Sequence, residues 1–128
     1  MKVLLSIKPE FAERIFSGEK KFEFRKTLFK NEKVTTVVIY ATMPTGKVVG
    51  EFEVGPILKD CPSKLWRKTK KFSGISKEFF EAYFQGRSSG YAISVKNAVR
   101  YEDPLELHML IPGGVPPQSF RYLNAVLP

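Results

Sequence analysis

The segment from Ser17 to Arg25 places three charged groups of different chemistry close together. An amine, a carboxylate and a guanidinium stand at Lys20, Glu23 and Arg25. The lysine and the arginine can bind an anion or orient a carboxylate, and the glutamate can accept hydrogen bonds or act as an acid or base. The alternative is an exposed Glu–Arg pair, which contributes little to stability. Spacing alone leaves both interpretations open.

A helix that leads directly into a strand would position these groups. Pro9 suits the first helical position because its ring fixes φ, and Gly18 suits the left-handed residue that follows a helix. Residues 22–25 alternate phenylalanine with charge, which predicts a strand whose two rings share one face. Glu23 and Arg25 would project from the other face, with Lys20 near the start of the strand.

The remaining elements follow from periodicity and turn residues. We expect strands at residues 2–7, 34–42, 47–58, 91–95 and 99–107, a short strand or extended tail at 120–123, and helices at 62–69 and after Ser76. Strands joined by short turns favour an antiparallel sheet or barrel with helices at its ends, rather than a parallel α/β sheet. We find no linker or repeat, so residues 1–128 are expected to form one domain.

The charge balance is strongly basic, with 21 Lys and Arg against 13 Asp and Glu and a net charge of +8. Such a surface attracts phosphate backbones first and anionic membranes second, although it can also serve solubility alone. Residues 64–72 add aromatic rings to the cations, as single-stranded nucleic acid binding requires. We place Trp66 in the core. Phosphate contacts are expected from Lys64, Arg67, Lys68, Lys70 and Lys71.

Several classes of site are excluded by composition. Cys61 is the one cysteine and His108 the one histidine, so the chain has no intramolecular disulfide, no thiol and imidazole zinc cluster and no Ser-His-Asp triad. We expect no metal and no cofactor. The N-terminal apolar stretch is too short for a signal peptide, and no stretch has the length of a membrane span. The expected location is cytoplasmic, without membrane binding.

Residues 18–25 match the pattern G-x-K-x-x-E-x-R, and on this motif the chain resembles the ASCH domain family of the PUA-like superfamily. The likeness extends over nearly the whole chain, in residues 6–10, 39–44, 49–54, 73–76 and 116–122. The last two of these segments resemble the stand-alone, mostly prokaryotic type of the family. The resemblance implies an α+β fold, a PUA-like mixed or antiparallel β-barrel with flanking helices. It also implies a cleft lined by Lys20, Glu23 and Arg25.

The family is generally regarded as binding RNA or other nucleic acid. The resemblance therefore implies a module that recognises RNA or a modified nucleoside in a basic cleft, and that could regulate transcription or translation. We expect further ligand contacts from Lys8, Tyr40, Ser119 and Tyr122, with core packing as the rival interpretation of Tyr40. The rings of the helix after Ser76 are expected in the core: Phe79, Phe80, Tyr83 and Phe84.

An enzyme is the alternative. One branch of the family hydrolyses an acetylated cytidine nucleoside, and a threonine nucleophile stands there at the position of Glu23. A carboxylate cannot simply take over the role of an alkoxide in amide cleavage, although it can activate a water. A hydrolase of N4-acetylcytidine-type nucleosides, or a nuclease, would use Lys20 and Glu23, with Thr42 as the substitute nucleophile. A third interpretation is an interaction protein whose basic surface contacts another macromolecule.

Overall fold

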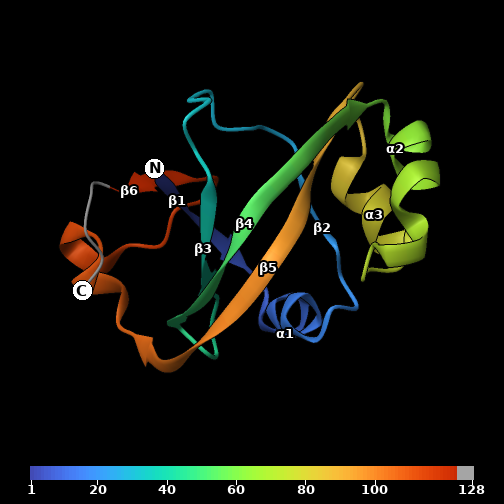
Figure 1. The fold of residues 1–128 in the computed structure, drawn as a ribbon. Coiled ribbons are helices and arrows are strands. Elements are labelled where there is room, and N and C mark those ends of the chain that lie inside the picture. Colours follow the sequence, from blue (N-terminus) through green and yellow to red (C-terminus); the bar gives the residue numbers. More distant parts are fainter. Residues whose placement is uncertain (124–128) are drawn as a thin grey trace.

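The computed structural model describes residues 1–123, which form a six-stranded mixed sheet with helices at its ends (Figure 1). The strands are β1 (Lys2–Ile7), β2 (Phe22–Arg25), β3 (Thr36–Ala41), β4 (Lys47–Asp60), β5 (Gly90–Leu105) and β6 (Arg121–Leu123). The α-helices are α1 (Pro9–Ser17), α2 (Pro62–Thr69) and α3 (Lys77–Phe84). Three short 3-10 helices complete the list: η1 (Lys70–Phe72), η2 (Leu107–Met109) and η3 (Pro112–Gly114).

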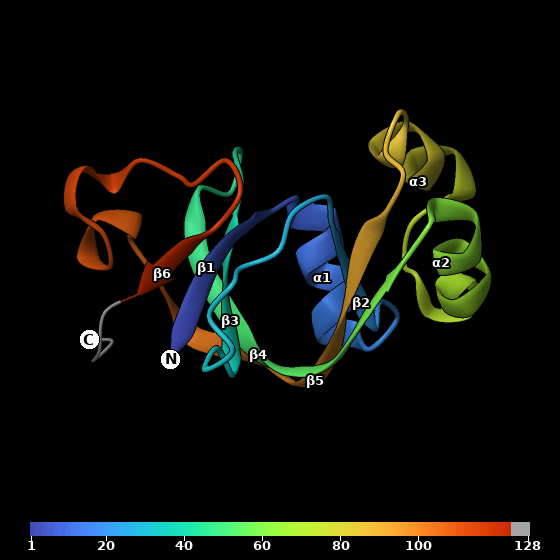
Figure 2. The same ribbon diagram turned by 90° about the horizontal axis from the view of Figure 1, so that it is seen from above.

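The strand order is β2-β5-β4-β3-β1-β6. Neighbouring strands are antiparallel except β1 and β3, which pair in parallel because α1 and β2 intervene between them in the chain. The expected α+β architecture of mixed strands with flanking helices is confirmed. The word barrel needs correction, since β2 and β6 are the edges of an open sheet. Figure 2 shows α1 lying in the hollow of the curved sheet, between β1 and β2.

The last long strand differs from our expectation. Residues 91–95 and 99–107 were predicted as two strands, whereas β5 runs unbroken from Gly90 to Leu105. Asn97 takes a positive φ of 47°, and the register between β4 and β5 shifts beside it. A bulge of this kind bends a strand without ending its pairing, so the interruption in the pattern marks a bend.

Three hydrophobic clusters stabilise the fold. Strand β1 contributes to two of them, since Val3 and Leu5 belong to the first and Leu4 to the second, as the prediction of a strand buried on both faces requires. The third cluster joins β2 to α2 and α3 through aromatic rings, including Phe24 and Phe80. No helix within residues 1–123 has the length and hydropathy needed to cross a membrane.

Candidate functional site

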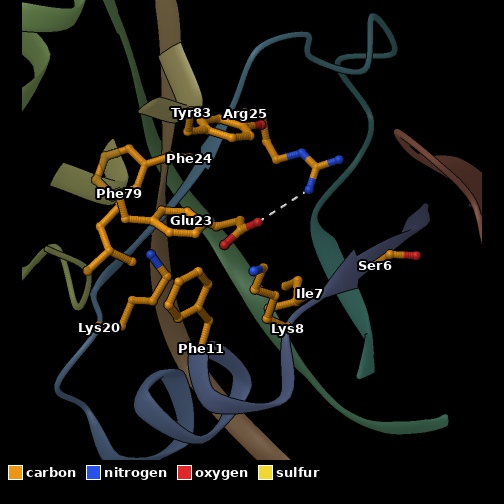
Figure 3. A pocket seen from close by; sticks show the side chains of 11 residues that line it. Ser6, Ile7, Lys8, Phe11, Lys20, Glu23, Phe24, Arg25, Phe79 and Tyr83 are labelled. Atoms are coloured by element: carbon orange, nitrogen blue, oxygen red, sulfur yellow. Dashed lines mark hydrogen bonds and ion pairs between the residues drawn. The ribbon is translucent and has the colours of Figure 1, made fainter. Parts of the chain in front are cut away.

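A cleft with a volume of about 200 Å³ lies where β1, α1, β2 and α3 meet (Figure 3). It is lined by Ser6, Ile7, Lys8, Phe11, Lys20, Glu23, Phe24, Arg25, Ile75, Phe79 and Tyr83. Four of the predicted site residues are among them: Lys8, Lys20, Glu23 and Arg25. The structure therefore brings the three charged groups of the motif together and adds Lys8 from the end of β1.

The local sequence explains this convergence. Gly18 has a φ of 85° and its N–H donates to the carbonyl of Ile15, so α1 ends in a left-handed residue as predicted. The N–H of Lys20 donates to the carbonyl of Arg14 at 2.9 Å, which turns the chain back toward the cleft. Strand β2 then begins at Phe22 and contributes Glu23, Phe24 and Arg25 to the cleft wall.

Lys20 is almost completely enclosed, with 1% of its surface exposed. Its Nζ donates to the carbonyl of Ser73 at 3.0 Å and lies 4.7 Å and 5.4 Å from the ring centroids of Phe24 and Phe11. Burial disfavours the ammonium and lowers the pKa of Lys20 to about 8, although the nearby Glu23 carboxylate opposes the shift. The cleft thus contains an amine that can be neutral near pH 8.

Glu23 and Arg25 form a partly enclosed ion pair beside this amine. Glu23 is 6% exposed, and Nη1 of Arg25 donates to its Oε2 at 3.3 Å. Nη2 of Arg25 donates to the carbonyl of Ser119 at 2.5 Å, so the guanidinium is held from two sides. Oε1 of Glu23 accepts no hydrogen bond from residues 1–123 and is not buried from solvent, which leaves an acceptor available to a ligand.

Aromatic rings form much of the cleft wall. Phe11 and Phe79 meet edge to face at 5.0 Å, and Phe24 and Tyr83 add two more rings. Our assignment of Phe79 to the core is wrong, because its ring is half-buried and lines the cleft, whereas Tyr83 lines the cleft and also packs against the third hydrophobic cluster. They share one face of α3, while Phe80 and Phe84 share the adjacent face and are buried. Helical spacing groups these pairs correctly but cannot tell which face meets the core.

The two predicted stacking tyrosines lie elsewhere. Tyr40 is 5% exposed and packs in the second hydrophobic cluster, so the structure places its ring in the core. Tyr122 packs edge to face on Phe120 at 5.4 Å. Its hydroxyl accepts hydrogen bonds from the N–H groups of Lys30 and Asn31 at 3.0 and 3.1 Å. The side chain thereby holds the loop after β2, and neither tyrosine lines the cleft.

Ser119 and Thr42 also lie outside the cleft lining. Ser119 helps to position Arg25, because its carbonyl accepts a hydrogen bond from the guanidinium. Its Oγ lies 3.0 Å from Oγ1 of Thr27. The N–H of Thr42 donates to the carbonyl of Ile7 at 3.0 Å, which places it near the cleft without a place on the wall. The geometry therefore gives no support to Thr42 as the nucleophile of an amidohydrolase.

The predicted phosphate-binding side chains are all exposed. They are Lys64, Arg67 and Lys68 of α2 and Lys70 and Lys71 of η1. Lys68 pairs with Asp60 at 3.0 Å, and the other four form no ion pair within the described part of the chain. Trp66 is half-buried and packs on Phe80 at 5.0 Å, in the third cluster. We call these five residues the basic surface.

Residues 1–123 contain no group of three or more His, Cys, Asp or Glu side chains placed to hold a metal ion. The polar groups that line the cleft are the amines of Lys8 and Lys20, the Glu23 carboxylate, the Arg25 guanidinium and the hydroxyls of Ser6 and Tyr83. The Tyr83 hydroxyl accepts from the N–H of Lys26 at 3.2 Å.

Comparison with known proteins supports the fold. The family model described as "ASCH domain" matches residues 5–104. The chain is 37% identical over 95% of its length to "Large ribosomal subunit protein uL22" of Ureaplasma parvum serovar 3, but it spans only 39% of that protein. It is 28% identical over 94% of its length to an "ASCH domain-containing ribonuclease" of Zymomonas mobilis, of which it spans 83%. The crystal structure of ASCH from Zymomonas mobilis superposes with a TM-score of 0.88 at 27% identity, over 96% of this chain and 87% of that one.

Proposed function

We propose that this chain, which belongs to the ASCH domain family, binds RNA and holds one unpaired base in its cleft. The observation that carries the proposal is the combination of a carboxylate, a guanidinium and an amine within walls of aromatic rings. Aromatic side chains stack on bases, and a carboxylate can accept a hydrogen bond from an exocyclic amine such as that of cytosine. The free Oε1 of Glu23 is the acceptor in this proposal.

The size of the cleft favours a single base. Its volume of about 200 Å³ lies below the roughly 300–1,000 Å³ of pockets that enclose drug-sized ligands. Sequence-specific RNA recognition uses unstacked bases from loops, bulges and single strands, which can enter such a space one at a time. Lys8 is exposed at the mouth, where its ammonium can approach a phosphate.

The basic surface supplies the second part of the proposal. Four of its cations make no ion pair within residues 1–123, so they are available to phosphates: Lys64, Arg67, Lys70 and Lys71. Phosphate contacts contribute affinity without sequence preference, while the cleft would select the base. Two relatives carry names that refer to a ribosomal subunit and to a ribonuclease, which supports RNA over DNA as the ligand.

A salt series tests RNA binding. For a single-stranded RNA oligonucleotide, the logarithm of the association constant should fall linearly with the logarithm of the salt concentration, by about 0.7 for each phosphate contact. The double variant Lys70→Gln, Lys71→Gln should lower that slope by about 1.4, through the loss of two contacts. Lys96→Gln removes one lysine charge from an exposed position on β5 and should leave the slope nearly unchanged. Binding that is absent, or insensitive to salt, would defeat the proposal.

RNA cleavage is a second candidate function, and the lowered pKa of Lys20 favours it. The neutral amine can accept the proton of a 2′-hydroxyl while the 2′-oxygen attacks the adjacent phosphorus. The bond from phosphorus to the 5′-oxygen then breaks, and that oxygen takes a proton from water. Arg25 lines the same cleft as Lys20, where its guanidinium can help to place the phosphate. The relative named as a ribonuclease supports this candidate.

The dependence of the cleavage rate on pH tests this second candidate function. Because the neutral amine is the active form, cleavage should rise with pH and level off above about 8. Lys20→Met keeps an apolar side chain of similar length among the rings and should abolish cleavage while the protein stays folded. An oligonucleotide with a 2′-deoxy sugar at the cut position should bind but remain intact. Cleavage by Lys20→Met, or a profile that is flat across pH 7–9, would remove Lys20 as the base.

A further inference from the structure

An exposed phenylalanine, Phe72, lies beside two lysines. It directly precedes Ser73, whose carbonyl accepts the hydrogen bond from Lys20. Phe72 ends η1 and is 39% exposed. Nζ of Lys21 lies 4.3 Å from its ring centroid, and Nζ of Lys71 lies 5.6 Å from it. Lys71 is the sequence neighbour of Phe72 in η1, whereas tertiary structure brings Lys21 to the ring from the turn before β2.

The environment of Phe72 differs from that of the other ring in its segment. Trp66 packs on Phe80 in the third hydrophobic cluster, where burial accounts for it. Phe72 keeps more than a third of its surface in water. An exposed ring with cations beside it provides the two contacts that single-stranded nucleic acid uses, stacking and phosphate pairing.

The backbone beneath the ring is fixed to the cleft. The N–H of Lys21 donates to the carbonyl of Phe72 at 2.9 Å, and Nζ of Lys20 donates to the carbonyl of Ser73 at 3.0 Å. Nη1 of Arg14 donates to the carbonyl of Gly74 at 2.8 Å. Three successive carbonyls are therefore held by donors from α1 and from the turn between α1 and β2. Phe72 stands on a rigid support, which lowers the entropy lost when a ligand stacks on it.

The same segment connects Phe72 to the cleft wall. Ile75 lines the cleft, and three trans peptide units separate its Cα from that of Phe72 by no more than about 11 Å. This distance suits a nucleotide next to the one in the cleft. The exposed side chains of α2 and η1 are mostly basic, so a phosphate backbone that leaves the cleft on this side meets cations.

We infer that Phe72 is a second base-stacking site, and that Lys21 and Lys71 bind the phosphate of the base stacked there. The ligand is single-stranded RNA with one base in the cleft and a neighbouring base on Phe72. This inference rests on the proposed function, since it extends the same RNA strand from the cleft to the basic surface. It assigns stacking to Phe72 rather than Trp66, the other ring of residues 64–72, and adds a cation, Lys21, that lies outside that charge run.

The test is a fluorescence anisotropy titration with two probes, a labelled single-stranded RNA octanucleotide and a labelled mononucleotide. Phe72→Leu should bind the octanucleotide about five- to tenfold more weakly, as expected for the loss of one stacked base, and Phe72→Trp should bind at least as tightly as the parent. Neither change should affect the mononucleotide. An octanucleotide series with one abasic position should include a position at which Phe72→Leu no longer has an effect.

Val99→Ala is the control, because Val99 is also an exposed apolar side chain, 54% exposed on β5. It should leave both affinities unchanged. If Phe72→Leu binds the octanucleotide like the parent while Arg25→Ala binds it weakly, the second site is refuted and the cleft proposal stands. If the parent binds neither probe, the proposed function itself fails. A loss of mononucleotide binding in Phe72→Leu would instead show that Phe72 acts on the cleft, and would also refute a separate site.

Discussion

Arg25→Ala should weaken RNA binding at least tenfold and lower the free energy of unfolding by about 3 kcal/mol. The substitution leaves the Glu23 carboxylate, which is 6% exposed, without its counterion, and uncompensated buried charge is strongly destabilising. It also releases the carbonyl of Ser119 from the guanidinium, which loosens the segment before β6. Urea unfolding and RNA titration of the same protein measure the two effects.

A double variant separates the two effects. Glu23→Gln combined with Arg25→Ala removes the stranded charge, so most of the lost stability should return while RNA binding stays weak. Arg100→Ala is the matched control, because it breaks an exposed ion pair with Glu13 and should change stability by no more than about 0.5 kcal/mol. If the double variant is as unstable as Arg25→Ala, charge pairing is not the cause. If Arg25→Ala binds RNA normally, the cleft is not the binding site.

Phe80→Ala should have the largest effect on stability, a loss of about 3–5 kcal/mol. Phe80 is fully buried, and its ring centroid lies 4.8 Å from Phe84, 5.0 Å from Trp66 and 5.1 Å from Phe24. Its removal opens a cavity in the cluster that holds α2 and α3 against β2. Because Phe24 also forms part of the cleft wall, RNA binding should weaken together with stability.

The neighbouring residue supplies the comparison. Phe79 lies on the adjacent face of α3, half-buried in the cleft wall, so Phe79→Ala should reduce RNA binding with a much smaller loss of stability. Thermal unfolding and RNA titration of the two variants should show this difference. Equal destabilisation by both substitutions would indicate that Phe79 is a core residue, as its spacing in the sequence suggested. Normal RNA binding by Phe79→Ala would remove its ring from the proposed site.

Local chemistry accounts for the elements that could be predicted from the sequence. Gly18 ends α1 because few other residues tolerate its φ, and Oγ of Ser76 accepts from the N–H of Phe79 at the start of α3, as an N-cap residue should. The alternation of residues 22–25 specified β2 and the face shared by Glu23 and Arg25. Each of these features depends on residues within one turn or one strand, so no knowledge of distant contacts was needed.

Tertiary structure decided the rest, because it depends on which faces meet. The amino-acid pattern grouped Phe79 with Tyr83 and Phe80 with Phe84, but only packing against β2 and α2 placed the first pair in the cleft and the second in the core. The sequence makes the Tyr40 ring a candidate for base stacking, yet the second hydrophobic cluster buries it. Long-range pairing likewise set the parallel β1–β3 contact and the open sheet. The sequence by itself thus determined the charged groups and their strand, and tertiary packing determined which rings surround them, since burial is a property of the whole fold.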